Sequence, residues 1–272
     1  MAVNDIRQQV FGCIRVRSQK SLFCFSLSIY YNPFMASYFF SDAHLGEADK
    51  EKEKIKLEKL KSFFEIVRED GEKLFILGDL FDFWFEYKHA IPKEHLKVVF
   101  QLSQLIELGI EVHYISGNHD FWLGDFLSRE AGIRIHRDYF VTTEQDKKLF
   151  LIHGDGLSPS DKGYRVLKRI LRNRFNIWLY QKLPPDWGIP LAKSVAGMSR
   201  SYTSNRTLKF IKDYEDYARR KINEGYDAVI IGHLHMAVLE IIDKGVYLNT
   251  GDFIENFSYG RMDNGEFTLE YI

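Results

Sequence analysis

Aspartate, histidine and asparagine residues follow five short apolar runs in this sequence. The five segments are Tyr38–His44, Phe75–Asp79, Ser116–Asp120, Leu151–Asp155 and Ile230–His235. A strand that is buried on both faces reads as a continuous apolar run, and open α/β sheets place their sites in loops at the carboxyl ends of strands. Carboxylates, imidazoles and amide oxygens are ligands of divalent metal ions. Five such segments in this order therefore predict a centre that binds two metal ions.

The aspartate of the second segment has the position expected for a ligand shared by two ions. Two divalent ions held about 4 Å apart can activate a bridging hydroxide and neutralise charge on a phosphoryl group. Such a pair needs one carboxylate that contacts both ions, and the tight Gly78-Asp79 turn would project Asp79 from the centre of the sheet. Asp42 and His44 are separated by one residue, so both can leave the same side of an extended strand end and bind one ion.

The remaining predicted ligands are one amide and three imidazoles. His233 and His235 repeat the spacing of the first segment. Asn118 would supply a neutral amide oxygen, and His153 another imidazole nitrogen. Three nearby carboxylates have two interpretations, because each could orient a ligand or cap a turn. These are Asp82, Asp120 and Asp155.

The composition is that of an ordinary globular protein, but its charge is unevenly distributed. Of the 272 residues, 45% are apolar and 28% are charged, and the net charge is −1. The window 162–212 holds twelve lysine or arginine residues and one acidic residue, a net charge of +11. This asymmetry predicts an anionic substrate or surface at one place. The sequence contains no apolar run of about 18 residues, so no membrane-spanning helix is expected.

Residues 1–34 differ from the rest of the chain. They contain the only two cysteines, Cys13 and Cys24, so no disulfide framework is indicated and a reducing cytoplasm fits. Basic residues precede an apolar stretch at 22–30, as in a secretory signal, but the stretch is short. We expect an upstream start or a loosely ordered extension at 1–34, followed by one domain at 35–272.

Alternating strands and helices predict a layered α/β fold. The interval between His153 and His233 has no convincing strand, which predicts a helical cap inserted over the site at about 157–225. Helices are expected at 50–70 and 93–108. Strands are expected at 38–41, 74–77, 112–115, 149–152, 228–231, 246–248 and 267–271.

The ordered motifs resemble the calcineurin-like metallophosphoesterase superfamily over residues 36–256. The motifs are Asp-x-His, Gly-Asp-x-x-Asp, Gly-Asn-His-Asp, His-Gly-Asp and Gly-His-x-His. The resemblance implies a four-layer αββα sandwich, and a metal pair that is commonly manganese. It implies one ion bound by Asp42, His44, Asp79 and His235, and a second bound by Asp79, Asn118, His153 and His233.

The same resemblance implies the catalytic residues. His119 corresponds to the superfamily's histidine that is not a ligand, which assists the leaving group or steadies the transferred phosphoryl group. Asp79, as the shared ligand, is the other residue expected to be essential for catalysis.

Within the superfamily, the chain is similar to the UDP-2,3-diacylglucosamine hydrolases. The shared features are the segment 78–84, Gly124, the segment 153–156, Asp161 and Gly163-Tyr164. The resemblance implies hydrolysis of the substrate's pyrophosphate to UMP and 2,3-diacylglucosamine 1-phosphate in lipid A biosynthesis. It also implies a cytoplasmic protein that contacts the inner leaflet of the cytoplasmic membrane, with no nucleic acid partner.

The helical insertion has the residue types that a lipid-linked nucleotide would require. Its basic residues could meet a diphosphate or an anionic membrane surface, and its apolar residues could line an acyl-chain chamber. An amphipathic helix that merely covers the core, with a solvated basic face, is the alternative. The substrate contacts that we expect are Asp161, Tyr164, Arg165, Arg200, Ser204 and Asn205.

One residue departs from the family pattern. Many diacylglucosamine hydrolases have arginine directly after the metal-binding asparagine, where this chain has His119. Another phosphoesterase or pyrophosphatase, with a nucleotide or nucleic acid substrate, therefore stays open as an alternative. A scaffold of the same fold without activity is the third reading, although such a protein would be expected to lose ligands.

Overall fold

The computed structural model describes residues 9–14, 23–28, 36–47, 49–192 and 207–272. The chain divides into two compact units, Met1–Met35 and Ala36–Ile272. In the first unit, strand β1 (Gln9–Ile14) pairs antiparallel with strand β2 (Phe23–Ser28). The sequence analysis did not anticipate this pair, and the origin of residues 1–34 stays a prediction.

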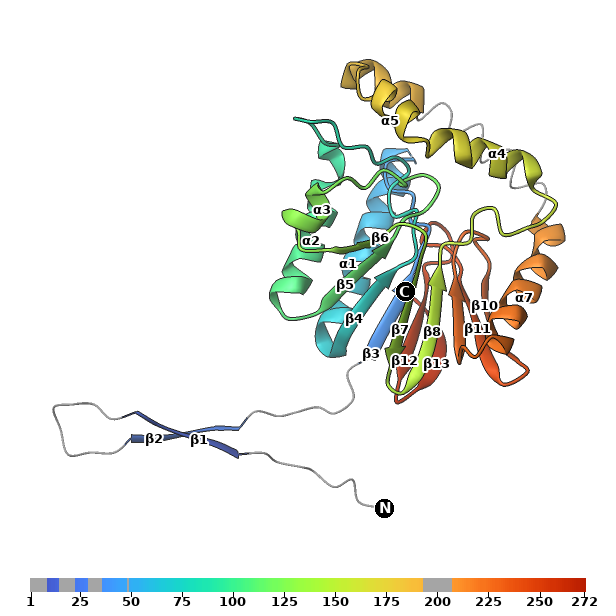
Figure 1. The fold of residues 1–272 in the computed structure, drawn as a ribbon. Coiled ribbons are helices and arrows are strands. Elements are labelled where there is room, and N and C mark those ends of the chain that lie inside the picture. The colour runs from blue at the N-terminus through green and yellow to red at the C-terminus, as the bar shows by residue number, and fades with distance from the viewer. Residues whose placement is uncertain (1–8, 15–22, 29–35, 48, 193–206) are drawn as a thin grey trace. The chain divides into compact units, whose positions relative to one another are not determined.

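The second unit contains a sheet of six strands that carries the first three ligand segments (Figure 1). Neighbouring strands from β3 to β6 are parallel, so their carboxyl ends meet at one edge. The order is β13 (Glu266–Tyr271), β12 (Ser258–Asp263), β3 (Ala36–Phe40), β4 (Gly71–Ile76), β5 (Glu111–Ile115) and β6 (Arg134–His136).

A sheet of five strands packs against the first one and carries the last two ligand segments. Strands β8, β9 and β11 are parallel to one another, and both outer strands are antiparallel to their neighbours. The order is β10 (Ala237–Ile242), β11 (Gly245–Thr250), β9 (Ala228–Ile231), β8 (Lys147–Ile152) and β7 (Tyr139–Glu144).

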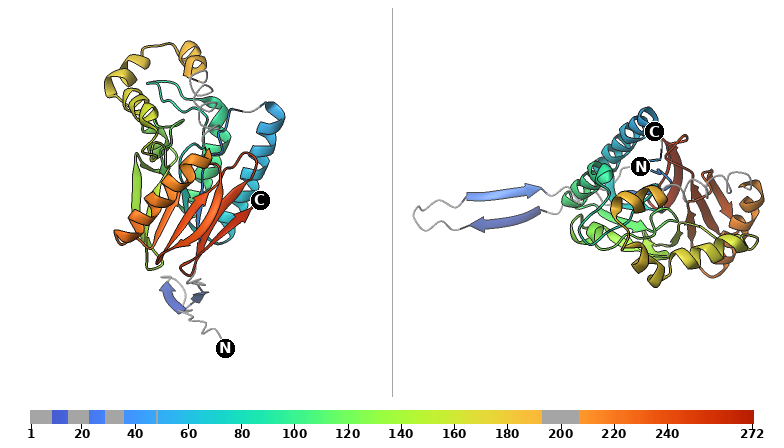
Figure 2. Two further views of the ribbon diagram at one scale, coloured as in Figure 1. Left: turned by 90° about the vertical axis from the view of Figure 1, so that its right-hand side faces the viewer. Right: turned by 90° about the horizontal axis from the view of Figure 1, so that it is seen from above.

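Helices cover the outer faces of both sheets (Figures 1 and 2). Helices α1 (Lys50–Asp70) and α2 (Leu96–Glu107), with the short η1 (Lys93–His95) and α3 (Phe126–Arg129), lie on the six-stranded sheet. Helix α7 (Thr207–Asn223) lies on the five-stranded sheet. A separate apolar layer joins the two sheets. The predicted four-layer αββα sandwich is therefore confirmed.

Helix α1 has the predicted bounds. Asp49 caps its first turn by accepting hydrogen bonds from the backbone N–H groups of the second and third residues after it. Ile55 is 43% exposed. The neighbouring Lys56 is instead buried, with Leu60 and Phe63 one and two turns further along.

The described part of the insertion (residues 157–225) consists of helices and loops. Helices α4 (Lys162–Leu171) and α5 (Arg174–Tyr180) lie beyond the carboxyl ends of the strands in Figure 1, and residues 185–192 are also helical. Its function as a cap stays a prediction. In the described ranges of the chain, no helix has the length and apolarity needed to cross a membrane.

Two histidines, the buried His113 and the half-buried His136, lie side by side on strands β5 and β6. His113 Nδ1 is 3.0 Å from His136 Nε2, and the His136 ring stacks on Phe140 with centroids 3.8 Å apart. Burial, together with the nearby His113 and Arg134, lowers the pKa of His136 to about 4. These rings are therefore neutral at pH 7 and belong to the packing of the sandwich.

Candidate metal centre

The predicted ligands converge at the carboxyl ends of the two sheets. Asp42 lies two residues after β3, Asp79 three after β4, and His153 directly after β8. His233 lies two residues after β9. Among the described residues, ligand atoms lie within 4.8 Å of one another in the groups Asp42–His44–His235, His44–Asp82–His119 and Asp79–His153–His233.

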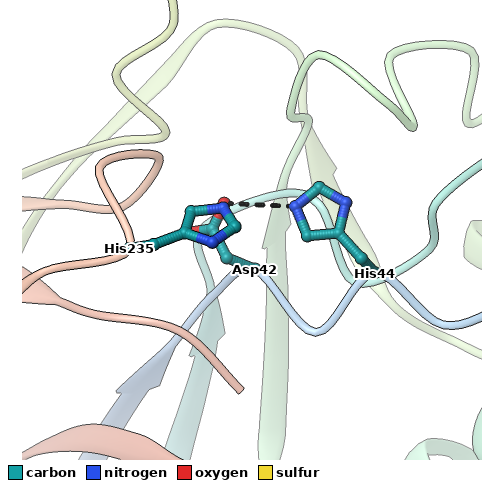
Figure 3. Close-up of side chains that lie close together, drawn as sticks. All are labelled: Asp42, His44 and His235. Atoms are coloured by element: carbon teal, nitrogen blue, oxygen red, sulfur yellow. Dashed lines mark ion pairs between the residues drawn. The ribbon is translucent and has the colours of Figure 1, made fainter. Parts of the chain in front are cut away.

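The first group joins the two sheets through Asp42 (Figure 3). The Asp42 carboxylate lies between the two imidazole rings, with its Oδ1 3.7 Å from His44 Nε2 and 3.3 Å from His235 Nε2. Its other oxygen, Oδ2, accepts a hydrogen bond of 2.8 Å from the backbone N–H of His233. Asp42 is therefore held from both sheets at once.

The group Asp79–His153–His233 is centred on His153. Its Nε2 lies 3.0 Å from the amide oxygen of Asn118 and 3.2 Å from His233 Nδ1. Its Nδ1 lies 2.7 Å from the carbonyl oxygen of Leu77, so Nδ1–H donates there and Nε2 is left as the lone-pair nitrogen. This tautomer suits a metal ligand.

Asp79 contacts both groups, as expected of a shared ligand. Its Oδ2 lies 3.7 Å from His44 Nε2 and 3.3 Å from His153 Nε2. Its Oδ1 accepts a hydrogen bond of 2.9 Å from the backbone N–H of His119. Gly117 gives the carboxylate room, because a Cβ atom there would lie 2.0 Å from Asp79 Oδ1.

Five of the seven predicted ligands have a left-handed backbone, a conformation that is uncommon for residues other than glycine. Such residues persist only where the surrounding structure fixes them, and they cluster at functional sites. The φ angles are 55° at Asp42, 42° at His44, 52° at Asp79, 70° at His233 and 54° at His235.

The buried carboxylates make the centre strongly attractive to cations. Burial would raise the pKa of Asp79, but His153 and His119 lower it well below its ordinary value. Burial likewise opposes protonation of His44, yet the adjacent Asp42 and Asp82 raise its pKa to about 10. The pKa of His153 is also raised to about 10, against the effect of burial, by Asp79. Protons and metal ions therefore compete for the same atoms.

Three buried atoms at the centre test whether a metal ion fits. Asp42 Oδ1 and both ring nitrogens of His44 are buried and have no hydrogen-bond partner among the described residues. Such atoms are costly unless something pairs with them. Carboxylate, imidazole and amide donors together suit a divalent ion. The residues present therefore fit divalent metal binding.

Asp82 and Asp120 hold the neighbouring histidine and loop in place. His119 Nδ1 lies 3.0 Å from the carbonyl oxygen of Asp82 and 3.3 Å from its carboxylate Oδ1. Asp120 accepts hydrogen bonds from the Tyr114 hydroxyl and, at 2.8 Å, from the backbone N–H of Gly117. Burial and the nearby Asp79 raise the pKa of Asp120 to about 6. Both carboxylates thus orient the loops that bear predicted ligands.

The predicted substrate contacts fall into two sets. The Tyr164 hydroxyl donates a hydrogen bond of 2.8 Å to Asp155 Oδ2, and Arg165 donates one of 2.8 Å to the carbonyl oxygen of Pro159. Asp161 directly precedes helix α4, and its Oδ1 is buried without a hydrogen-bond partner in the described part of the chain. The other three predictions lie outside the described residues: Arg200, Ser204 and Asn205.

Basic residues of the insertion reach the edge of the centre. Lys168 Nζ lies 2.8 Å from Asp155 Oδ2, and Arg172 lies 3.6 Å from the same oxygen. Arg172 also donates a hydrogen bond of 2.8 Å to the carbonyl oxygen of Gly117. Part of the positive window therefore neutralises a buried carboxylate and ties the insertion to the Asn118 loop.

The sequence analysis missed two side chains that support Asp42 and His44. The Ser41 hydroxyl hydrogen bonds to the Asp42 carboxylate and lies 2.7 Å from Thr250 Oγ1. Lys56 donates hydrogen bonds to the carbonyl oxygens of Ala43 and His44. A lysine at a core position of a helical stripe was the available signal for the second; we see none for Ser41.

The match to a family model defines the class of the protein. The model of calcineurin-like phosphoesterases matches residues 35–237, and the chain therefore belongs to this family. The resemblance predicted from the ligand motifs is thus confirmed, and so is the expectation of a phosphoesterase fold.

Named relatives narrow the comparison further. A UDP-2,3-diacylglucosamine hydrolase from Porphyromonas gingivalis is 31% identical, covering 86% of this chain and 96% of the relative. A protein of the same name from Haemophilus influenzae is 29% identical, covering 85% and 97%. One from Nitrosococcus oceani is 30% identical, covering 74% and 79%. The chain is thus similar to these hydrolases over most of their length.

Proposed function

We propose that this protein hydrolyses the pyrophosphate bond of UDP-2,3-diacylglucosamine and releases UMP and 2,3-diacylglucosamine 1-phosphate, a step of lipid A biosynthesis. The observation that carries the proposal is the convergence of five separate segments on the Asp79 carboxylate, which contacts His44 and His153 together. Relatives that align over most of their length bear the name of this hydrolase.

The centre would hold two divalent ions, and manganese is our choice because a mixed carboxylate, amide and imidazole set accommodates it. When bound, the ions would activate the attacking water and offset negative charge on the phosphoryl oxygens. The residues that would hold one ion are Asp42, His44, Asp79 and His235, and those for the other are Asp79, Asn118, His153 and His233.

His119 would act on the leaving group. Its Nδ1 faces two oxygen atoms of Asp82, at 3.0 and 3.3 Å, so this contact fixes the ring. Its Nε2 is then the atom left to protonate the oxygen of the departing sugar phosphate. A positioned general acid typically contributes about 10²–10⁴-fold to the rate.

The insertion would act as the cap that receives the glycolipid. Phe175, Trp178 and Leu179 of helix α5 are 65%, 51% and 55% exposed, although they are large and apolar. An exposed apolar group beside basic residues suits acyl chains and the anionic surface of the inner leaflet, reached from the cytoplasmic side. Aromatic rings beside basic residues could also stack the bases of a single-stranded nucleic acid, so the test includes an oligonucleotide. The proposed polar contacts to the substrate are Asp161, Tyr164, Arg165, Arg200, Ser204 and Asn205.

The test is release of UMP by the purified full chain with Mn²⁺ and UDP-2,3-diacylglucosamine in mixed micelles. A UDP-sugar without acyl chains and a single-stranded oligonucleotide serve as competing substrates. We expect UMP from the acylated substrate at a much higher kcat/KM than from the UDP-sugar, and no cleavage of the oligonucleotide. No UMP with Mn²⁺, Mg²⁺ or Zn²⁺, or faster cleavage of the oligonucleotide, would refute the proposal.

A further inference from the structure

Lys56 is a charged residue at a core position of helix α1. Its side chain is 2% exposed, and it continues the buried stripe formed by Leu60, Phe63 and Val67. Burying an ammonium group is unfavourable unless its donors are paired. An apolar residue would suit this stripe by packing alone, so the lysine needs another explanation.

The ammonium group has two hydrogen-bond acceptors and one ion-pair partner around it. Lys56 Nζ donates hydrogen bonds of 3.0 Å to the carbonyl oxygen of Ala43 and 2.6 Å to that of His44. It also lies 3.0 Å from Glu53 Oε2. The other oxygen of Glu53 accepts a hydrogen bond of 2.9 Å from the backbone N–H of Gly46. The pair Lys56–Glu53 thus binds the loop at three points.

The opposite side of this loop is bound by the segment that bears the shared ligand. The backbone N–H of Asp42 donates to Gly78 O at 3.1 Å, and that of His44 donates to Asp79 O at 3.0 Å. The loop therefore lies between helix α1, which binds its carbonyl groups, and the Asp79 turn, which binds its N–H groups.

His44 depends on its backbone for its position. Its φ angle of 42° is left-handed, and neither ring nitrogen has a hydrogen-bond partner among the described residues. No hydrogen bond to the ring therefore orients it. The ring nitrogens lie 3.7 Å from carboxylate oxygens of Asp42, Asp79 and Asp82, beyond hydrogen-bond distance. The hydrogen bonds of this residue are those of its main chain, and the shortest of them in the described structure is the 2.6 Å bond from Lys56.

We propose that Lys56 is a positioning residue of the metal centre, which holds the Asp42–His44 loop in its ligand-presenting conformation through the carbonyl oxygens of Ala43 and His44. The inference rests on the proposed metal-dependent hydrolysis and extends it to a residue on the first helix. Lys56 acts through His44 and does not itself touch an ion or the substrate.

The test compares Mn²⁺ affinity in Lys56→Met with that in Lys54→Met. Lys54 lies on the same helix, with a side chain 67% exposed and 3.9 Å from Glu58, so its loss should leave the loop unchanged. Each full-length variant is stripped with a chelator, and Mn²⁺ binding is measured by titration calorimetry and electron paramagnetic resonance. We expect the dissociation constant of Lys56→Met to rise about 10–100-fold, as for other residues that orient ligands, and that of Lys54→Met to stay within twofold.

Thermal unfolding of the metal-free variants separates positioning from general destabilisation. A weaker Mn²⁺ affinity in a Lys56→Met protein that unfolds, without metal, near the temperature of Lys54→Met supports the proposal. A dissociation constant within twofold of the unsubstituted protein overturns it. If Lys56→Met does not fold, the same titration is made with Glu53→Gln. A rise of about threefold or more in its Mn²⁺ dissociation constant supports the proposal, and a smaller rise overturns it. Failure of the unsubstituted protein to bind Mn²⁺ would instead overturn the proposed function itself.

Discussion

Replacing Asp79 with asparagine should remove metal binding and activity together. The substitution keeps the size of the side chain and removes its charge. Asp79 Oδ2 lies 3.7 Å from His44 Nε2 in one ligand group and 3.3 Å from His153 Nε2 in the other. Both proposed ions therefore lose their shared anionic ligand at once, in a site where the carboxylate is buried.

The size of the loss follows from the burial of this carboxylate. Removing one partner of a buried charge pair costs about 3–5 kcal/mol. Applied to each ion, that cost raises the dissociation constant about 10²–10⁴-fold, since about 1.4 kcal/mol corresponds to a tenfold change. At micromolar free Mn²⁺ the variant should then hold almost no metal, and UMP release should fall by at least about 10⁴-fold.

His119→Gln is the matched control for this experiment. It removes the proposed acid but no proposed ligand, so activity should fall by about 10²–10⁴-fold while the metal content stays that of the unsubstituted protein. Metal is measured by elemental analysis after dialysis against Mn²⁺, and activity by UMP release. An Asp79→Asn protein that retains full metal content would refute Asp79 as the shared ligand.

Three further outcomes test other parts of the structure. Gly117→Ala should weaken Mn²⁺ binding by at least about 100-fold, because its Cβ would lie 2.0 Å from Asp79 Oδ1 and overpacking forces neighbours apart. Trp178→Ser should weaken sedimentation with anionic vesicles about fivefold, since this half-exposed ring would leave the bilayer surface. His136→Gln should make the folded protein less sensitive to acid. The pKa of His136 is about 4 in the folded protein and lies below its ordinary value of 6.5. Folding stability that is present above pH 6.5 is therefore lost as the pH falls through 4, and the variant lacks this loss.

Each of these outcomes has its own measurement. Urea unfolding of the metal-free chain at pH 7 and pH 4.5 checks His136→Gln, for which a difference on the order of 1–2 kcal/mol is expected once partial exposure of the ring is allowed for. Equal acid sensitivity in the variant would contradict it. For Trp178→Ser, neutral vesicles are the reference, and unchanged binding to anionic ones would exclude this ring from the surface. For Gly117→Ala, an unaltered Mn²⁺ dissociation constant would show that the loop adapts.

The ligand segments could be located from the sequence because their strands have no polar face. Phe75 and Ile76 of β4 face the two opposite apolar layers of the sandwich, and both are fully buried. A run of this kind can only be a central strand, so the polar residue that follows it must lie at the sheet edge. Helix α1 was equally clear, and its bounds agree with the prediction.

Strands β10 and β12 were not predicted, although the edge strand β13 was. Strand β10 begins at Ala237, directly after the last ligand segment, and its alternation is obscured because Glu240 and Ile241 are both exposed. Strand β12 contains Gly260, where a Cβ atom would lie only 2.5 Å from the Leu248 side chain. Residues of this kind have low strand preference and are placed by tertiary contacts that the sequence alone does not reveal.

The backbone of the centre was also beyond sequence reasoning. An i, i+2 pair was expected to leave one side of an extended strand, yet Asp42 and His44 both have left-handed φ angles of 55° and 42°. The two residues lie at the centre as expected, but the conformation that presents them is different. It is set by contacts from helix α1 and from the Asp79 turn, which are distant in sequence.

The predicted ligands come from both halves of the sandwich, and this has a consequence for residues far from the chemistry. An ion held by Asp79 and His153 would link the two sheets. Its preferred distances to these ligands must therefore agree with the thickness of the apolar layer between the sheets. The side chains of Phe39 and Phe75, which enter that layer from adjacent strands of the six-stranded sheet, help to set its thickness. Altering such spacer residues would be a way to retune which metal the enzyme accepts without touching a single ligand.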